Sequence, residues 1–328
     1  MTSTNLRIVF MGTPDFATHI LAGLLKTKHS IVGVITAPDK PAGRGQKVSE
    51  SSVKKFSESH NLNILQPTNL KDENFLSSLT ELAADLFVVV AFRMLPEKVW
   101  NMPPKGTINL HASLLPNYRG AAPINWAIIN GEEKTGVTTF FIEQEIDTGM
   151  VIERAETKID CNETAGELHD RLMEIGSQLI NSSVEKISNG SVTRTPQSQL
   201  IEQNELPIAP KIFKPICEVN WGKSCTEIHN LCRGLSPYPT AWTTIYEEDK
   251  QDLKTIKLFT TEVTDLNSTN KTKVLFQKDG LYIPCKDYYL KVLELQPEGK
   301  KRMNYKDFAA GYNKNNYHVK FSKKDLKQ

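Results

Sequence analysis

Four short, predominantly apolar segments in the first third of the chain constrain its fold more than any other feature. They are Leu6–Met11, Ile31–Thr36, Leu86–Phe92 and Gly106–His111. Between them lie Phe16–Lys26, with apolar residues at helical spacing, and Ser51–His60, also expected to be helical. Apolar strands that alternate with helices are typical of a parallel sheet covered on both faces. We therefore predict an α/β fold with an open, mostly parallel, Rossmann-like sheet and helices on both faces.

The pattern changes after these strands. Residues 136–143 and 150–154 flank a turn at Asp147–Gly149, which favours a hairpin. Thr164–Glu167 has the composition of a capping box, the signal that opens a helix. Apolar residues at helical spacing follow it, and Asn189–Gly190 supplies the stop.

A second domain is expected in the last third of the chain. Residues 188–215 lack apolar periodicity and are rich in Ser, Thr, Gln and Pro, as linkers are. A helix at Ser224–Gly234 and several short β-type segments follow, which predict a small, OB-like β-barrel. The tail from Lys314 onward is Lys- and Asn-rich and is expected to fray. The predicted boundaries are a first domain at 1–190, a linker at 191–208 and a barrel domain at 209–328.

Composition excludes several classes of protein. The chain carries 13 Phe, 9 Tyr and 4 Trp, which need a folded core, so general disorder is excluded. The longest apolar run, Leu86–Phe92, is far shorter than the ~20 residues of a membrane-spanning helix. The first residues resemble neither a signal peptide nor a transit peptide, so a cytoplasmic location without membrane contact is expected.

Five cysteines without a Cys-x-x-Cys pair indicate reduced thiols rather than a disulfide framework. Cys225, His229 and Cys232 share one face of the predicted helix, a spacing that a metal site could use. A buried stripe with Ile228 and Leu235 is the favoured interpretation, because free cysteines are usually buried. No metal is expected.

The formal net charge of +2 conceals an asymmetry. Residues 1–205 contain 19 Lys and Arg against 24 Asp and Glu, whereas residues 206–328 contain 21 against 14. A basic second part suits a polyanionic partner such as a nucleic acid. A lysine-rich solvated surface explains the same charge equally well.

Polar and apolar residues alternate along Thr107–Ser113. Alternate residues of a strand share a face, so Asn109 and His111 point to one side near the carboxyl end of a parallel strand. Open α/β sheets bind their ligands beyond these ends. An amide donor beside a titratable imidazole suits acyl transfer, in which an oxyanion forms and a proton moves. For an isolated Asn-x-His pattern, however, two polar residues hydrogen-bonded at a strand end are the commoner outcome.

Asp147 strengthens this hypothesis only if the fold brings it to His111. A carboxylate there would orient the imidazole and favour its charged form. Asp-Thr-Gly alone is ordinary turn chemistry. Gly12–Ala17 follows the first strand, where anions often dock, but it lacks the G-x-G-x-x-G pattern, so a dinucleotide-dependent oxidoreductase is not favoured.

Four blocks in order resemble the methionyl-tRNA formyltransferase family: Gly12–Ala17, Pro38–Gly45, Asn109–Pro123 and Asp147–Gly149. Part of this set is also found in formyltransferases acting on glycinamide ribonucleotide and on nucleotide-sugar amines. The Pro-Ala-Gly-Arg-Gly loop and Arg233–Trp242 are similar to the tRNA enzymes in particular. The resemblance runs from near Leu6 to near Ala310. Ala91–Pro96 departs from it, being slightly shorter and carrying Arg93 in place of a Gly.

The resemblance implies formyl transfer from 10-formyltetrahydrofolate to the amino group of methionyl initiator tRNA, for translation initiation. The implied catalytic residues are Asn109, His111 and Asp147. The residues implied to contact the folate co-substrate are Ser113, Leu114, Leu115 and Pro116. The residues implied to contact the tRNA acceptor end are Arg44 and Lys40.

The basic second domain then has a partner, the tRNA backbone, with Lys300–Arg302 as candidate contacts. Tyr238 and Trp242 suit base stacking, although core packing is favoured for both. The chain is expected to act as a monomer. Two alternatives are kept. A small-amine formyltransferase gives the basic domain no role, and a non-catalytic RNA-binding protein requires the loss of catalytic groups that are present.

Overall fold

The computed structural model describes residues 4–42, 47–202, 205–247, 253–268, 272–311 and 317–319. Its contacts divide the chain into two compact units, each discontinuous in sequence. The first takes the chain up to Gly120, Thr135–Thr157 and His169–Ile208; the second takes Ala121–Lys134, Lys158–Leu168 and the chain from Ala209 onward. Residues 191–208, predicted as a linker, thus belong to the first unit, because Thr195 exchanges two backbone hydrogen bonds with Val151.

The first unit is built on one sheet with the strand order β10-β9-β7-β6-β1-β2-β5. Its strands are β1 (Arg7–Gly12), β2 (Ser30–Ile35), β5 (Ile64–Leu65), β6 (Leu86–Val90), β7 (Thr107–His111), β9 (Lys134–Phe141) and β10 (Val151–Lys158). The strands from β5 to β7 pair in parallel, and β9 joins β7 antiparallel. This confirms the predicted open, mostly parallel sheet, and β9 and β10 form the predicted hairpin edge.

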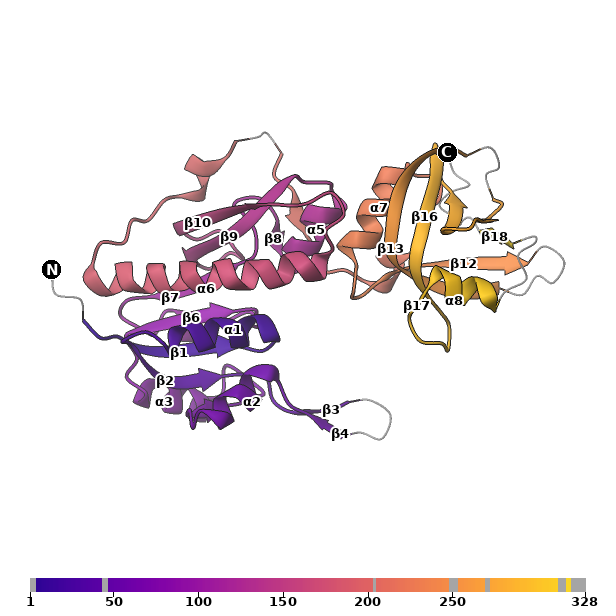
Figure 1. Ribbon diagram of the computed structural model, residues 1–328. Helices are drawn as coiled ribbons and strands as arrows, with labels where there is room; N and C mark the ends of the chain where they lie inside the picture. Colours follow the sequence, from indigo (N-terminus) through magenta and orange to yellow (C-terminus); the bar gives the residue numbers. More distant parts are fainter. Residues whose placement is uncertain are drawn as a thin grey trace. The chain divides into compact units, whose positions relative to one another are not determined.

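Helices cover both faces of this sheet (Figure 1). They are α1 (Asp15–Leu24), α2 (Ser52–Ser59), α3 (Glu73–Glu81), α4 (Glu97–Trp100) and α6 (Ala165–Asn189). A Cβ built on Gly176 of α6 would lie 2.8 Å from Leu110 of β7 and 3.5 Å from Ile20 of α1, so α1 and α6 share one face. On the other face, Phe75 of α3 and Val99 of α4 join one apolar cluster with the strands. The predicted capping box of Thr164 and Glu167 opens α6.

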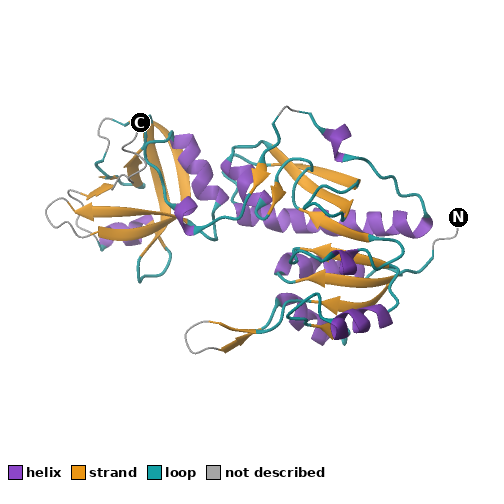
Figure 2. Ribbon diagram, turned by 180° about the vertical axis from the view of Figure 1, so that it is seen from behind, coloured by secondary structure: helices purple, strands orange, loops and turns teal. Residues whose placement is uncertain are grey.

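The segment 38–46, predicted as a loop, contains part of a β-hairpin instead. β3 (Lys40–Ala42) pairs antiparallel with β4 (Lys47–Ser49), apart from the main sheet (Figure 2). Among the described residues β3 pairs with β4 and with no other strand, and proline is tolerated in such edge strands. A breaker residue such as Pro41 therefore does not exclude a strand.

The second unit is a nearly closed antiparallel barrel, as predicted. Its sheet order is β14-β15-β16-β13-β12-β18, with β17 beside β16. The strands are β12 (Ala241–Glu247), β13 (Leu253–Asn267), β14 (Leu275–Phe276), β15 (Leu281–Pro284), β16 (Tyr288–Pro297), β17 (Met303–Asn304) and β18 (Tyr317–Val319). A bridge between Lys273 and His318 joins the two ends of the sheet. The expectation that the chain frays beyond Lys314 is wrong for β18, because Tyr317 and Val319 are buried in the barrel core.

Helices α5 (Pro123–Ile129), α7 (Cys225–Gly234) and α8 (Tyr305–Ala310) complete this unit. The short strand β11 (Ile208–Ala209) lies where the first unit ends in the sequence and the second resumes. Asn125 of α5 donates a hydrogen bond to the carbonyl of Gly234 at the end of α7. The Arg233 guanidinium donates to the carbonyls of Asp160 and Glu163. These contacts explain why segments that precede α6 belong to the second unit.

The stripe of Cys225, His229 and Cys232 is buried in the core of the second unit, as favoured from the sequence. His229 donates from Nε2 to the Cys161 carbonyl at 3.2 Å, and its Nδ1 accepts from the Thr261 hydroxyl at 2.9 Å. Both ring nitrogens are thereby used. Within the described ranges, no three His, Cys, Asp or Glu side chains gather as metal ligands do, and no helix is long and apolar enough to cross a membrane.

The two aromatic residues expected to pack in the core behave differently. Trp242 is partly buried against the barrel core and donates from its indole to the Lys214 carbonyl. Tyr238 is 83% exposed, so core packing is wrong for it. It lies in the turn between α7 and β12, where Thr240 bonds back to the carbonyls of Pro237 and Leu235, and this turn holds Tyr238 away from the barrel interior.

Candidate active site

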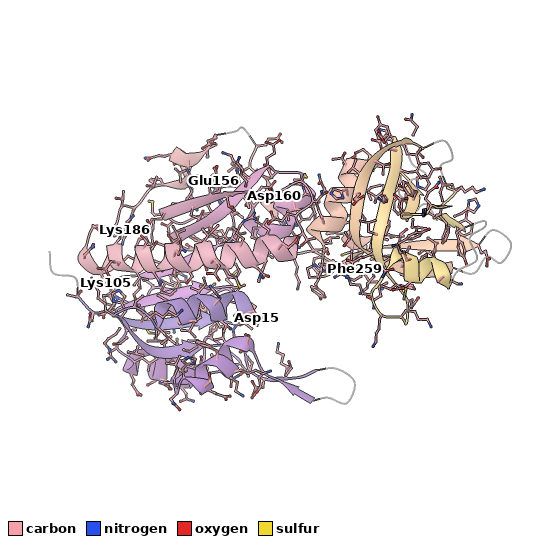
Figure 3. The ribbon with its side chains drawn as sticks, in the orientation of Figure 1. Asp15, Lys105, Glu156, Asp160, Lys186 and Phe259 are labelled. Carbon is pink, nitrogen blue, oxygen red and sulfur yellow. The ribbon has the colours of Figure 1, made fainter. Side chains whose placement is uncertain are left out.

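The site lies where β7 ends, at the edge of the sheet that also carries the start of α1. Figure 3 labels Asp15, which follows β1, and Lys105, which precedes β7, at opposite edges of the sheet. Asn109 is paired with Val89, which belongs to the cluster under α3 and α4, so Asn109 and His111 share that side of the sheet. The alternation predicted from the sequence is confirmed, with Ile108 and Leu110 buried on the opposite side.

The Asn109 amide is half-buried. Among the residues that the structure describes, it has no hydrogen-bond partner. A partly exposed amide that no described protein group pairs with is available to donate a hydrogen bond to a ligand oxygen.

His111 is 7% exposed and its ring is fixed at one nitrogen. Nε2 lies 2.9 Å from the carbonyl oxygen of Tyr118. Because a carbonyl only accepts, the proton of the neutral ring is on Nε2. Nδ1 is left facing the Oδ2 atom of Asp147 at 3.9 Å, the separation of an ion pair rather than of a direct hydrogen bond.

Asp147 is brought to His111, as the hypothesis required. Its Oδ2 atom accepts a hydrogen bond from the backbone N–H of Gly120 at 2.9 Å, and its φ of 56° is in the left-handed region. A Cβ on Gly149 would lie 1.8 Å from the Phe141 carbonyl oxygen, so only glycine fits there. The Asp147–Gly149 turn therefore needs a left-handed residue at its first position and a glycine at its last. Turn propensity alone does not reveal these two requirements.

Two groups that hold this site are backbone atoms: the Tyr118 carbonyl and the Gly120 N–H. Their residues are within the Asn109–Pro123 block, but a backbone contact leaves no trace in side-chain chemistry. The sequence therefore gave no reason to single them out, apart from the Gly at position 120, where φ is 123°.

The four side chains expected to contact folate are mostly buried. Ser113 and Leu115 are fully buried and Pro116 is also buried, whereas Leu114 is half-buried. The Ser113 hydroxyl donates to the Asn117 carbonyl at 2.6 Å, and Leu115 packs with Phe140. Of the four side chains, Leu114 is the most accessible.

Of the two residues expected to contact tRNA, one lies in the hairpin of the first unit. Lys40 begins β3 and is exposed. Arg44 lies outside the described residues. In the segment that departs from the family pattern, the guanidinium of Arg93 donates to the carbonyls of Pro67 and Thr68 and lies 5.5 Å from the Phe92 ring centroid.

Two family models cover most of the chain. The model described as "Formyl transferase" matches residues 6–184, and "Formyl transferase, C-terminal domain" matches residues 211–313. A methionyl-tRNA formyltransferase of Flavobacterium johnsoniae is 52% identical over 307 residues, which cover 93% of this chain and 96% of that protein. The chain belongs to the methionyl-tRNA formyltransferase family. A methionyl-tRNA formyltransferase of Bacteroides fragilis is 46% identical over 314 residues, which cover 95% of this chain and 97% of that protein.

Solved structures share the fold of this formyltransferase. A sugar 3N-formyltransferase determined with dTDP and 5-N-formyl-THF has a TM-score of 0.63 at 20% identity, covering 91% of this chain and all of that one. The N-formyltransferase of Helicobacter canadensis, determined with folinic acid and dTDP-3-aminofucose, has a TM-score of 0.64 at 19% identity and the same coverage. At 19–20% sequence identity, the likeness to these two structures establishes the shared fold alone.

Proposed function

We propose that this enzyme transfers the formyl group of 10-formyltetrahydrofolate to the amino group of methionyl initiator tRNA. The observation that carries the proposal is the unpartnered Asn109 amide beside His111 at the carboxyl edge of the sheet, in a chain 52% identical to a methionyl-tRNA formyltransferase. A formyl oxygen fits this place because it supplies the acceptor that a half-buried amide lacks. The folate supplies the formyl group.

In the proposed reaction a new C–N bond forms between the methionine nitrogen and the formyl carbon. The bond between that carbon and the folate N10 breaks, and a proton passes from the methionine nitrogen to N10. Negative charge grows on the formyl oxygen, and the Asn109 amide donates to it. Such a donor is worth most in the transition state, when the charge is largest.

His111 has one ring nitrogen free for proton transfer. The Tyr118 carbonyl holds the proton on Nε2, so Nδ1 is the atom that can take and return a proton, directly or through a water molecule. Asp147 stabilises the imidazolium that forms when Nδ1 is protonated, since its carboxylate lies 3.9 Å away. The backbone N–H of Gly120 keeps this carboxylate oriented.

The tRNA substrate is supported by the charge distribution. The basic part after residue 205 suits a polyanion, and a small amine would leave it without a role. The decisive experiment incubates the full chain with 10-formyltetrahydrofolate and charged initiator tRNA and measures formyl-methionine. Charged elongator methionyl-tRNA and a dTDP-linked amino sugar serve as competing substrates. Faster formylation of the amino sugar would replace this proposal with the small-amine alternative.

A further inference from the structure

A buried glutamine from the segment predicted as a linker contacts both loops that hold the catalytic histidine. Gln197 begins a short 3-10 helix, Gln197–Leu200, and is only 4% exposed. Its backbone is placed by Thr195, two residues earlier, which pairs with Val151 at the start of β10. A buried amide side chain is retained only when its donors and acceptor are used.

Both ends of the Gln197 amide are used. Nε2 donates to the carbonyl oxygen of Asp147 at 2.8 Å and to that of Gly149 at 3.0 Å. Oε1 accepts from the guanidinium of Arg119, from Nε at 3.0 Å and from Nη2 at 2.5 Å. One side chain thus joins the Asp-Thr-Gly turn to the residue between Tyr118 and Gly120.

These two loops are the ones that set the geometry of His111. The Tyr118 carbonyl receives the proton of His111 Nε2, and the Gly120 N–H donates to the Asp147 carboxylate. Asp147 also has a left-handed backbone conformation, which is uncommon for residues with a side chain, although Asp adopts it more readily than most. The hydrogen bond from Gln197 to the Asp147 carbonyl helps to hold it in this conformation.

We propose that Gln197 is a positioning residue for formyl transfer, which holds Asp147 and the Tyr118–Gly120 loop in register around His111. This inference rests on the function proposed above. Gln197 touches no reacting atom in this arrangement; it acts through Asp147. Its loss should therefore lower kcat and leave the KM for tRNA nearly unchanged, because misplacement of a catalytic group by about 1 Å can cost on the order of 100-fold.

Two substitutions separate the contacts. Gln197→Glu keeps oxygens that accept from Arg119 but removes the donors to the Asp147 and Gly149 carbonyls, and Gln197→Met removes both sets. We expect each to lower kcat roughly 10- to 100-fold with tRNA KM changed less than about twofold. Gln199→Met is the matched control, because Gln199 is exposed in the same 3-10 helix, and it should match the wild type. Circular dichroism at the assay temperature confirms that each variant is folded.

A double-mutant cycle with Asp147→Asn distinguishes positioning from general destabilisation. If Gln197 acts through Asp147, adding Gln197→Met to Asp147→Asn should lower kcat by less than about threefold further. Full additivity of the two losses, or an unchanged kcat in folded Gln197→Glu, would overturn the inference while the proposed function stands. A wild-type chain that formylates neither tRNA nor a small amine would overturn both.

Discussion

The Nζ atom of Lys54 lies 2.5 Å from the Oδ2 atom of Asp39, so helix α2 is tied to the residue immediately before the hairpin of β3 and β4. The Lys54 side chain is 13% exposed and also contacts Glu50 at 2.7 Å. Gln66 donates to the other oxygen of Asp39 at 2.9 Å. Hydrogen bonds from Lys54 and Gln66 lower the pKa of Asp39, so both charges persist at neutral pH.

This ion pair holds the residue next to Lys40, the first residue of β3. If the hairpin meets the tRNA acceptor end, Lys54→Met should raise the KM for tRNA several-fold and leave folate binding unchanged. Lys54→Arg should raise the KM for tRNA less than Lys54→Met does, since arginine keeps the positive charge. Lys55→Met, on the exposed side of the same helix, is the control. Equal tRNA KM values in Lys54→Met and Lys55→Met would show that the ion pair serves only local stability.

The catalytic assignment predicts a loss of turnover rather than of binding. Asn109→Ala, His111→Ala and Asp147→Asn should each lower kcat, by on the order of 100- to 1,000-fold where a donor to the growing negative charge is lost. The three losses should not add, because the groups act as a unit. Steady-state kinetics with saturating folate and tRNA measures this. Near-normal kcat in His111→Ala would remove His111 from the mechanism.

Arg44 provides a separate test of the expected contact with the tRNA acceptor end. Arg44→Ala should weaken reaction with tRNA while folate binding survives, because the substitution removes a positive charge from a segment expected to approach the acceptor end. Separate titrations of folate and tRNA against the variant measure the two effects. A solvated loop without a role predicts that neither titration changes.

The basic part of the chain predicts a salt-dependent affinity. Lys300 and Lys301 are exposed, whereas Arg302 is paired with Glu294 and lies 4.4 Å from the Phe259 ring centroid. Each lysine that neutralises a phosphate should contribute about 0.7–0.9 to the slope of log affinity against log salt. Replacing both with Gln should flatten the slope, and the same change at exposed Lys26 and Lys71 should not. Equal slopes for the two double variants would make Lys300 and Lys301 part of a solvated surface.

The salt dependence of tRNA affinity should be measured on the intact chain. A fragment that ends near residue 206 is less suitable. The structure assigns Ala121–Lys134 and Lys158–Leu168 to the second unit, so such a cut would separate them from α7. A weaker affinity of the fragment would then report on misfolding as much as on lost phosphate contacts.

His229 predicts how stability depends on pH. Burial is the largest cause that lowers the pKa of His229 below 6.5, so the unfolded chain binds a proton more readily than the folded one. Stability should therefore fall as pH drops below 6.5, by at most about 1.4 kcal/mol per pH unit from this group. Urea unfolding at several pH values should show that the free energy of unfolding falls less below pH 6.5 in His229→Gln than in the wild type. Exposed His60→Gln should behave like the wild type, and an identical fall in all three would exclude this role.

The fold was largely predictable because burial on both faces leaves a continuous apolar signature, as in Leu86–Val90. Asn109 and His111 could be placed on one face from strand alternation alone. The contact with Asp147 could not be predicted, because it joins two segments far apart in the sequence through a turn whose Asp147 carboxylate is held by the backbone N–H of Gly120. Gln197 gave no signal either: it lies in a segment without periodicity, and its role comes from backbone carbonyls that meet only in the folded chain.

The hydrogen bond from Asn125 to Gly234 joins residues 109 positions apart. At about 5–20 residues per second, a ribosome needs roughly 5–20 s to make the chain between them. During that interval α5 has been synthesised but its partner α7 has not, and Pro123, Ala127 and Ile128, which are buried in the finished protein, lack their cover. The nascent chain thus carries an incomplete helix pair while about a third of its residues are added, and folding of the second unit can finish only after α7 has left the exit tunnel.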